Sequence, residues 1–238
     1  MILGQSAPPD QLLAALDHML GDPGLDPAFR ALCLRLPSAD DMAQGLKDAG
    51  FTPDPDAIHQ QTRRLRGIIA DRLERPLARL YADMSDGGAF NPDARAAGRR
   101  ALRLATLACL SEQDGGRRAA ALYADATNMT ERQGALVCLL RAGKGQGELA
   151  DFYQRFRANR LVIDKWFALQ ATNAAPDQAV TVARTLAEHP DFEWKNPNRF
   201  RALLGGLSGN HAGFHHASGA AYDFYADWLI RLDPLNPQ

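Results

Sequence analysis

The chain has 238 residues, a formal net charge of −1 and 46% hydrophobic residues. This composition is ordinary for a globular protein, and it argues against a basic nucleic-acid-binding surface and against an acidic tail. The length allows one large domain or two small ones. We expect a single helical domain over residues 1–238, with a possible subdivision near 84–91.

The cysteines and the chain's hydropathy indicate the compartment. Cys33, Cys109 and Cys138 are odd in number, widely spaced and set among apolar residues. This pattern is typical of buried free thiols in a reducing compartment. No apolar run reaches membrane-spanning length, and residues 1–5 lack the basic region and apolar core of a signal peptide. We therefore expect a cytoplasmic protein without a membrane span.

Helical periodicity dominates the first half of the chain. Capping residues predict helices that begin at Asp10, Asp26, Ser38 and Asp54, and glycine or proline ends the first three near Gly21, Pro37 and Gly50. Pro76 interrupts the fourth helix, so we expect a kink or a restart there. Acidic residues are interleaved with the arginines of this stretch, which favours a solvated helix face over a nucleic-acid site.

The second half continues in the same way. Asn91-Pro92 predicts a helix start, and Thr130 to Gln133 reads as a capping box. Further helices are predicted over about 119–124, 148–157, 160–172, from Pro176, from Asn196 and over 220–232, with a loop over 209–219. About a dozen helices joined by short turns should form antiparallel neighbours. The fold class is therefore all-α, as an irregular, HEAT-like, curved superhelical array without a strict repeat period.

The stretch from Asn196 to Arg201 is the most informative. Asn196 is a strong N-cap residue, and Pro197 suits the first helical position. This predicts a helix that continues through Leu204. Arg199 and Arg201 are two residues apart, about 200° around a helix, so they point to opposite sides. Either one packs along a neighbouring helix while the other faces an open space, or both are solvated.

Motifs of catalysis are not found in this sequence. It contains no His-Glu-x-x-His pair, which zinc peptidases use to hold the metal and to activate water. His211 and His215 are four residues apart, but they lie in a predicted glycine-flanked loop, so packing is favoured over metal binding. No nucleophile elbow or phosphate loop occurs either. We assign no catalytic residue and no metal ligand.

Several uncommon strings carry a resemblance to a known family. They are Asp164–Thr172, Asn196–Arg201 and Phe214–His215, with weaker matches at Asp54–His59 and Asn128–Thr130. Together, and in this order, they resemble the C-terminal helical domain of bacterial aminopeptidase N, a zinc peptidase of the gluzincin class. The resemblance extends from about residue 10 to the end, so the chain looks like a fragment of such an enzyme.

The resemblance implies a function for this region. In the family, the C-terminal domain closes a substrate chamber over the zinc site of an earlier domain, and the parent removes N-terminal residues from peptides. The second arginine of the family's Asn-Pro-Asn-Arg-x-Arg string faces the chamber, which here is Arg201. Asn198, in the same string, is the other candidate for contact with substrate. Phe200 stands where the family often has an aliphatic residue, a mild departure that leaves the arginines in place.

The same resemblance implies cofactor and partners. Zinc would belong to the parent and not to this chain, which we expect to be inactive alone. The partners would be the remaining domains of the parent and its peptide substrates, and the isolated chain could self-associate through faces that the parent covers. The alternative is a stand-alone helical-repeat adaptor that binds proteins on its concave face. The match to the enzyme and the abrupt end of the sequence favour the first interpretation.

Overall fold

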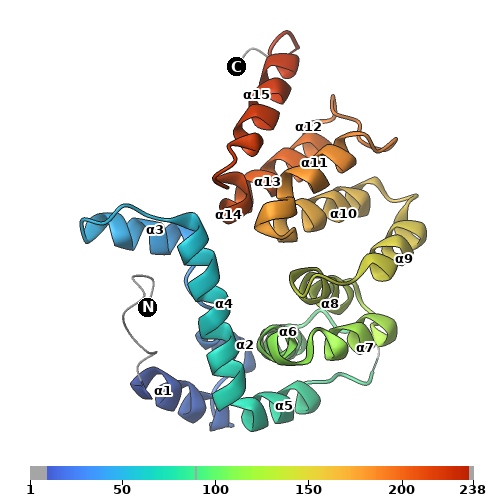
Figure 1. Cartoon of the computed structure of the whole chain (residues 1–238). Coiled ribbons are helices and arrows are strands. Elements are labelled where there is room, and N and C mark those ends of the chain that lie inside the picture. The colour runs from blue at the N-terminus through green and yellow to red at the C-terminus, as the bar shows by residue number, and fades with distance from the viewer. Residues whose placement is uncertain (1–9, 89, 236–238) are drawn as a thin grey trace. The chain divides into compact units, whose positions relative to one another are not determined.

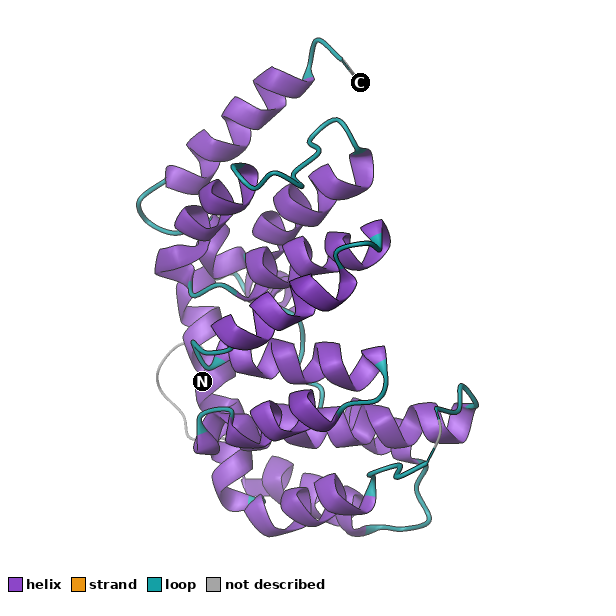
Figure 2. Cartoon of the chain, turned by 90° about the vertical axis from the view of Figure 1, so that its right-hand side faces the viewer, coloured by secondary structure: helices purple, strands orange, loops and turns teal. Residues whose placement is uncertain are grey.

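A computed structural model describes residues 10–88 and 90–235 of the chain. Within these ranges every regular element is helical, as Figure 2 shows, and no strand occurs. The all-α array expected from the helical periodicity is confirmed. No helix in the described ranges is long and apolar enough to cross a membrane.

The chain divides into two compact units. The described residues of the first unit are 10–45, 57–88 and 90–145, and those of the second are 46–56 and 146–235. The change of unit after Gly145 lies away from residues 84–91, where the sequence suggested a possible subdivision. Whether residues 1–238 behave as a single domain stays a prediction.

The first unit contains α1 to α8, except for the C-terminal end of α3 and the first residues of α4. These belong to the second unit. Its helices are α1 (Asp10–Gly21), α2 (Pro27–Cys33), α3 (Ala39–Asp48), α4 (Pro55–Arg72), α5 (Glu74–Asp83), α6 (Ala94–Asp114), α7 (Arg117–Asp125) and α8 (Met129–Arg141). The long helix α6 packs against α2, α5, α7 and α8, so it forms the centre of this unit (Figure 1). Leu102, Leu107 and Leu110 of α6 are fully buried there, in a core made largely of leucine.

The predicted interruption at Pro76 is a restart. Helix α4 ends at Arg72 and α5 begins at Glu74, with Leu73 between them at φ −116° and ψ 23°. Pro76 is therefore the third residue of α5. At that position its missing N–H would have no intrahelical partner in any case.

Two predicted helix caps were wrong by two residues. The cap of α6 is Asp93, whose Oδ1 accepts the N–H of Ala96 at 2.7 Å, while Asn91 Oδ1 accepts the N–H of Asp93 in a turn before the helix. The cap of α8 is Asn128 and not Thr130. Its Oδ1 accepts the N–H of Glu131 at 2.9 Å, and its Nδ2 donates to Glu131 Oε2 at 2.8 Å. In both cases a side chain slightly up or down the sequence supplies the better acceptor.

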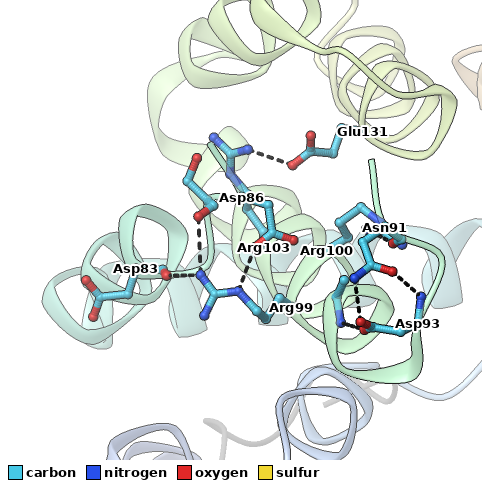
Figure 3. A network of polar contacts seen from close by, with 10 residues as sticks. Asp83, Asp86, Asn91, Asp93, Arg99, Arg100, Arg103 and Glu131 are labelled. Atoms are coloured by element: carbon cyan, nitrogen blue, oxygen red, sulfur yellow. Dashed lines mark hydrogen bonds and ion pairs between the residues drawn. The ribbon is translucent and has the colours of Figure 1, made fainter. Parts of the chain in front are cut away.

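Arginines of α6 form hydrogen bonds and an ion pair with neighbouring segments, as Figure 3 shows. Arg99 donates to the carbonyl oxygen of Asp83 at 2.7 Å and to Asp86 Oδ1 at 2.9 Å, which fixes the end of α5. One turn along, Arg103 pairs with Glu131 of α8 at 2.6 Å. Both side chains of this second pair are mostly buried. These contacts cross between helices, so they fix the spacing of α5, α6 and α8.

The second unit contains the remaining helices. They are α9 (Gln146–Phe156), α10 (Arg160–Asn173), a 3-10 turn (Pro176–Gln178), α11 (Ala179–Ala187), α12 (Pro197–Phe200), a π-helical turn (Arg201–Gly205), α13 (Gly206–Gly209), α14 (His211–Phe214) and α15 (Ala220–Leu232). Helix α10 contacts α9, α11, α12, the π turn and α13 (Figure 1). The core of this unit contains several aromatic side chains, among them the buried Phe152, Phe167, Phe192 and Trp228. The predicted loop over 209–219 was partly wrong, because α14 lies within it.

Candidate substrate-contact site

The helix that begins at Pro197 is built as its sequence predicts. Asn196 is the N-cap, and its Oδ1 accepts the N–H of Asn198 at 3.0 Å. Pro197 occupies the first helical position, where its lack of an N–H costs no hydrogen bond. The carbonyl oxygen of Asn196 accepts the N–H of Phe200 at 2.9 Å and closes the first turn.

The continuation of this helix differs from the prediction. A π-helical turn follows at Arg201–Gly205 before α13 begins at Gly206. A π turn contains one more residue than an α turn, and such turns are frequent at functional sites. Gly206 packs closely on α10, where an added Cβ would lie 3.0 Å from the Cβ of Ala171 and 3.3 Å from the carbonyl oxygen of Ala168. The pair Gly205-Gly206 is the only hint of this break that the sequence offers.

Arg199 lies inside the unit. The residue is only 3% exposed, and its Nε donates to Asp164 Oδ1 of α10 at 2.5 Å. A second nitrogen donates to the carbonyl oxygen of Asp191, and the guanidinium lies over the ring of Phe167 at 4.9 Å. The alternative that both arginines are solvated is therefore wrong. Arg199 joins α12, α10 and the segment before α12.

A second polar contact supports the same segment. Tyr153 Oη of α9 donates to Asp191 Oδ2 at 2.7 Å. This hydrogen bond is the first cause, before burial, of a raised pKa of Tyr153. Neither Asp164 nor Asp191 was predicted as a partner of Arg199. In the sequence Asp164 stands beside Lys165, and nothing there identifies the distant Arg199 as its partner.

Arg201 and Asn198 lie on the exposed side of the helix. Neither side chain makes a hydrogen bond or an ion pair within residues 10–88 and 90–235. A guanidinium presents five donors in a planar fork that matches a carboxylate or a pair of carbonyl oxygens. The structure thus brings Arg201 and Asn198 to one exposed turn, with their functional groups available to a ligand.

The described residues form no group that fits a zinc ion. In the part of the chain that the structure describes, no three side chains of His, Cys, Asp or Glu are grouped so that they could hold a metal. The ring centroids of His211 and His215 are 6.2 Å apart. His211 begins the short helix α14, where the sequence had suggested a loop, and His215 directly follows that helix. His215 Nδ1 is hydrogen-bonded to Tyr222 Oη at 2.7 Å.

Comparison with known families decides what kind of domain this is. The family described as "Domain of unknown function (DUF3458_C) ARM repeats" matches residues 2–238, almost the entire chain. The chain belongs to this family of ARM-repeat domains. Helices alone, as in the described part of this chain, are what such repeats consist of.

Aminopeptidases are among the curated relatives of the chain. The chain is 42% identical over 229 residues to aminopeptidase N of Caulobacter vibrioides and 32% identical over 236 residues to aminopeptidase N of Escherichia coli. These matches cover 94% and 97% of this chain but 26% of each relative. The chain therefore spans about a quarter of the length of the curated relatives that it matches.

A solved structure shows the same fold. Aminopeptidase A of Legionella pneumophila, crystallised in complex with aspartic acid, is similar to this chain with a TM-score of 0.87 and 26% sequence identity. The similarity covers 99% of this chain and 29% of that protein. The matched quarter is the C-terminal part of aminopeptidase N, which confirms the resemblance stated from the sequence strings.

Proposed function

We propose that this chain is the non-catalytic C-terminal domain of a zinc-dependent aminopeptidase, which closes a substrate chamber over the active site of a catalytic domain outside this sequence. The observation that supports this most is the match of nearly the whole chain to one quarter of aminopeptidase N. The parent would remove N-terminal residues from peptides in the cytoplasm. A domain that closes the chamber in this way would admit small peptides and exclude bulk water.

Within that chamber we assign the contact with peptide to Arg201, assisted by Asn198. Both side chains are exposed and have no partner in the described residues. The guanidinium of Arg199, in contrast, already donates to Asp164 and to the carbonyl oxygen of Asp191. An arginine holds a carboxylate through two parallel hydrogen bonds, which a lysine cannot reproduce. Arg201 would therefore bind the part of a peptide that lies away from the scissile bond.

Zinc would be held by the parent's catalytic domain, since this chain offers no suitable group of ligands in its described part. The partners are accordingly the other domains of the parent and its peptide substrates. The isolated chain should be inactive, and it should self-associate where the parent would cover its apolar surface. Ile230 and Leu229 on α15 are two such exposed residues, at 72% and 49%.

The reading frame that encodes this chain tests the proposal directly. A His-Glu-x-x-His motif upstream in the same frame would support it. An independent start codon with no such motif would reject it and favour the helical-repeat adaptor. Metal-dependent hydrolysis of an aminoacyl chromogenic substrate that copurifies with the isolated chain would contradict the non-catalytic assignment.

A further inference from the structure

A small cavity lies in the first unit, away from the Arg201 turn. It has a volume of about 130 Å³ and is lined by residues of α4, α6 and α8 and by the turn after α6. Ser111 and Cys138, each 6% exposed, are its buried polar lining. Arg63, Glu112 and Arg141 line it nearer to solvent. This volume suits a group of a few heavy atoms.

Positive charge predominates around the cavity. Arg63 and Arg66 share one carboxylate, that of Glu112, with N–O distances of 3.3 and 3.6 Å. Arg141 adds a third guanidinium. Lys144 is also close, because its Nζ would lie 3.3 Å from a Cβ added at Gly115.

The remaining acid nearby does not offset this charge. Asp114 pairs with Arg118 at 2.9 Å and accepts the N–H of Gly116. Among the described residues that line the cavity, Glu112 is the carboxylate, and Arg63 and Arg141 carry the guanidinium groups. Arg141 is an exposed residue, but its pKa is lowered. The larger cause is partial desolvation of its guanidinium, and the second is the positive charge of Arg66. An added anion would relieve this repulsion.

A buried hydroxyl group lies on the inner wall of the cavity. Ser111 Oγ is buried and, apart from the weak contact with the neighbouring Cys138 thiol, has no hydrogen-bond partner. Buried hydroxyl groups are usually satisfied, so one that faces a cavity points to a ligand or an ordered water. Cys138 does not compete as an anion, because burial raises the pKa of its thiol and keeps it neutral.

We propose that this cavity is a binding site for a small oxyanion, a phosphate or a carboxylate, which accepts from Ser111 Oγ and is held by Arg63 and Arg141. Three independent features of the cavity support it: its size, the excess of guanidinium groups over carboxylates, and the unpartnered hydroxyl. The site does not depend on the proposed peptidase function. It would make this domain responsive to a small anion at a place separate from peptide contact.

Thermal unfolding of the chain tests the site. The unfolding midpoint is measured against increasing phosphate, and separately succinate, at constant ionic strength maintained with chloride. We expect a saturable rise with at least one of the two anions, and the tighter one identifies the source as phosphate or carboxylate. No saturable rise with either anion would overturn the proposal.

Variants separate specific binding from a general charge effect. Arg141→Gln and Ser111→Ala should each weaken the apparent affinity about tenfold or more, since each removes a direct contact. Arg64→Gln is the matched control, because it removes the same charge from an exposed residue of α4 that does not line the cavity. Equal weakening by Arg64→Gln would overturn the proposal.

Ser111→Ala also distinguishes loss of anion binding from a general loss of stability. Removal of an unpartnered buried hydroxyl leaves the anion-free protein as stable as before or more stable. The proposal requires that this variant keep its unfolding midpoint without anion and lose the response to anion. A variant that keeps the full response would show that Ser111 makes no contact and would contradict the site.

Discussion

Arg199 and Arg201 are separated by a single residue, yet their guanidinium groups lie in opposite environments. Arg199 is enclosed by Asp164, the carbonyl oxygen of Asp191 and the ring of Phe167. Arg201 is exposed and has no such partner in the described residues. The comparison teaches that residue type does not decide the role here. The helix turn directs one arginine to the core and leaves the next available for binding.

The largest expected effect tests the buried arginine. Arg199→Ala should lower the free energy of unfolding by about 3 kcal/mol, because it leaves the Asp164 carboxylate largely desolvated and without its cation. Urea unfolding of the isolated chain measures this. Arg201→Ala is the control and should stay within about 0.5 kcal/mol of the unmodified chain. Equal losses for the two variants would abolish the distinction.

A glycine pair tests how the turn that contains Arg201 is seated on α10. Gly206→Ala should cost about 1–3 kcal/mol, because the new Cβ would crowd Ala171 and the carbonyl oxygen of Ala168. Gly205→Ala should be neutral or slightly stabilising, because nothing lies within 4 Å of its added Cβ and alanine favours helix. The same unfolding assay decides, and a larger loss at Gly205 would show that the packing is misassigned.

Loss of the N-cap of α12, the helix turn that positions both arginines, should give a smaller effect. Asn196→Ala should destabilise the chain by about 1 kcal/mol, because the N–H of Asn198 loses its acceptor. Asn198→Ala leaves the cap intact and should change stability little. If Asn198→Ala proved the more destabilising of the two, its side chain would have a structural role and would be a poor candidate for substrate contact.

The smallest effect concerns pH. The pKa of Tyr153 is raised above its usual value near 10 by the hydrogen bond to Asp191, so the fold favours the neutral phenol. The stabilisation is therefore fully present below about pH 10 and is lost as pH rises through the folded-state pKa. Tyr153→Phe should flatten the alkaline decline of the unfolding midpoint. If the unfolding midpoint of Tyr153→Phe declined with pH as in the unmodified chain, groups other than Tyr153 would cause the decline.

Much of the fold could be predicted from local signals. Helical periodicity and residues such as Asp26 and Asn196 place most helices correctly, because a cap and its helix are neighbours in sequence. The wrong starts at α6 and α8 have a common cause. Several Asn, Asp and Thr residues lie within a few positions, and which one caps depends on backbone angles that the sequence does not specify.

The site was predictable only in part. The separation of Arg199 and Arg201 follows from the angle between residues on a helix. The partner of Arg199 lies 35 residues away in Asp164, and such a contact depends on tertiary packing. The π turn at Arg201–Gly205 was also missed, and the close approach of Gly206 to α10 directly after it is likewise a tertiary contact.

The most direct test of the account is peptide kinetics in the full-length parent enzyme carrying Arg201→Ala or Arg199→Ala. Charge-assisted hydrogen bonds are worth about 1.5–3 kcal/mol, so Arg201→Ala should weaken tripeptide binding roughly tenfold to a hundredfold. A single-residue chromogenic substrate, which does not reach Arg201, should be nearly unaffected, and Arg199→Ala should lower stability more than affinity. Unchanged tripeptide kinetics in Arg201→Ala, or a larger loss of affinity in Arg199→Ala, would contradict the account.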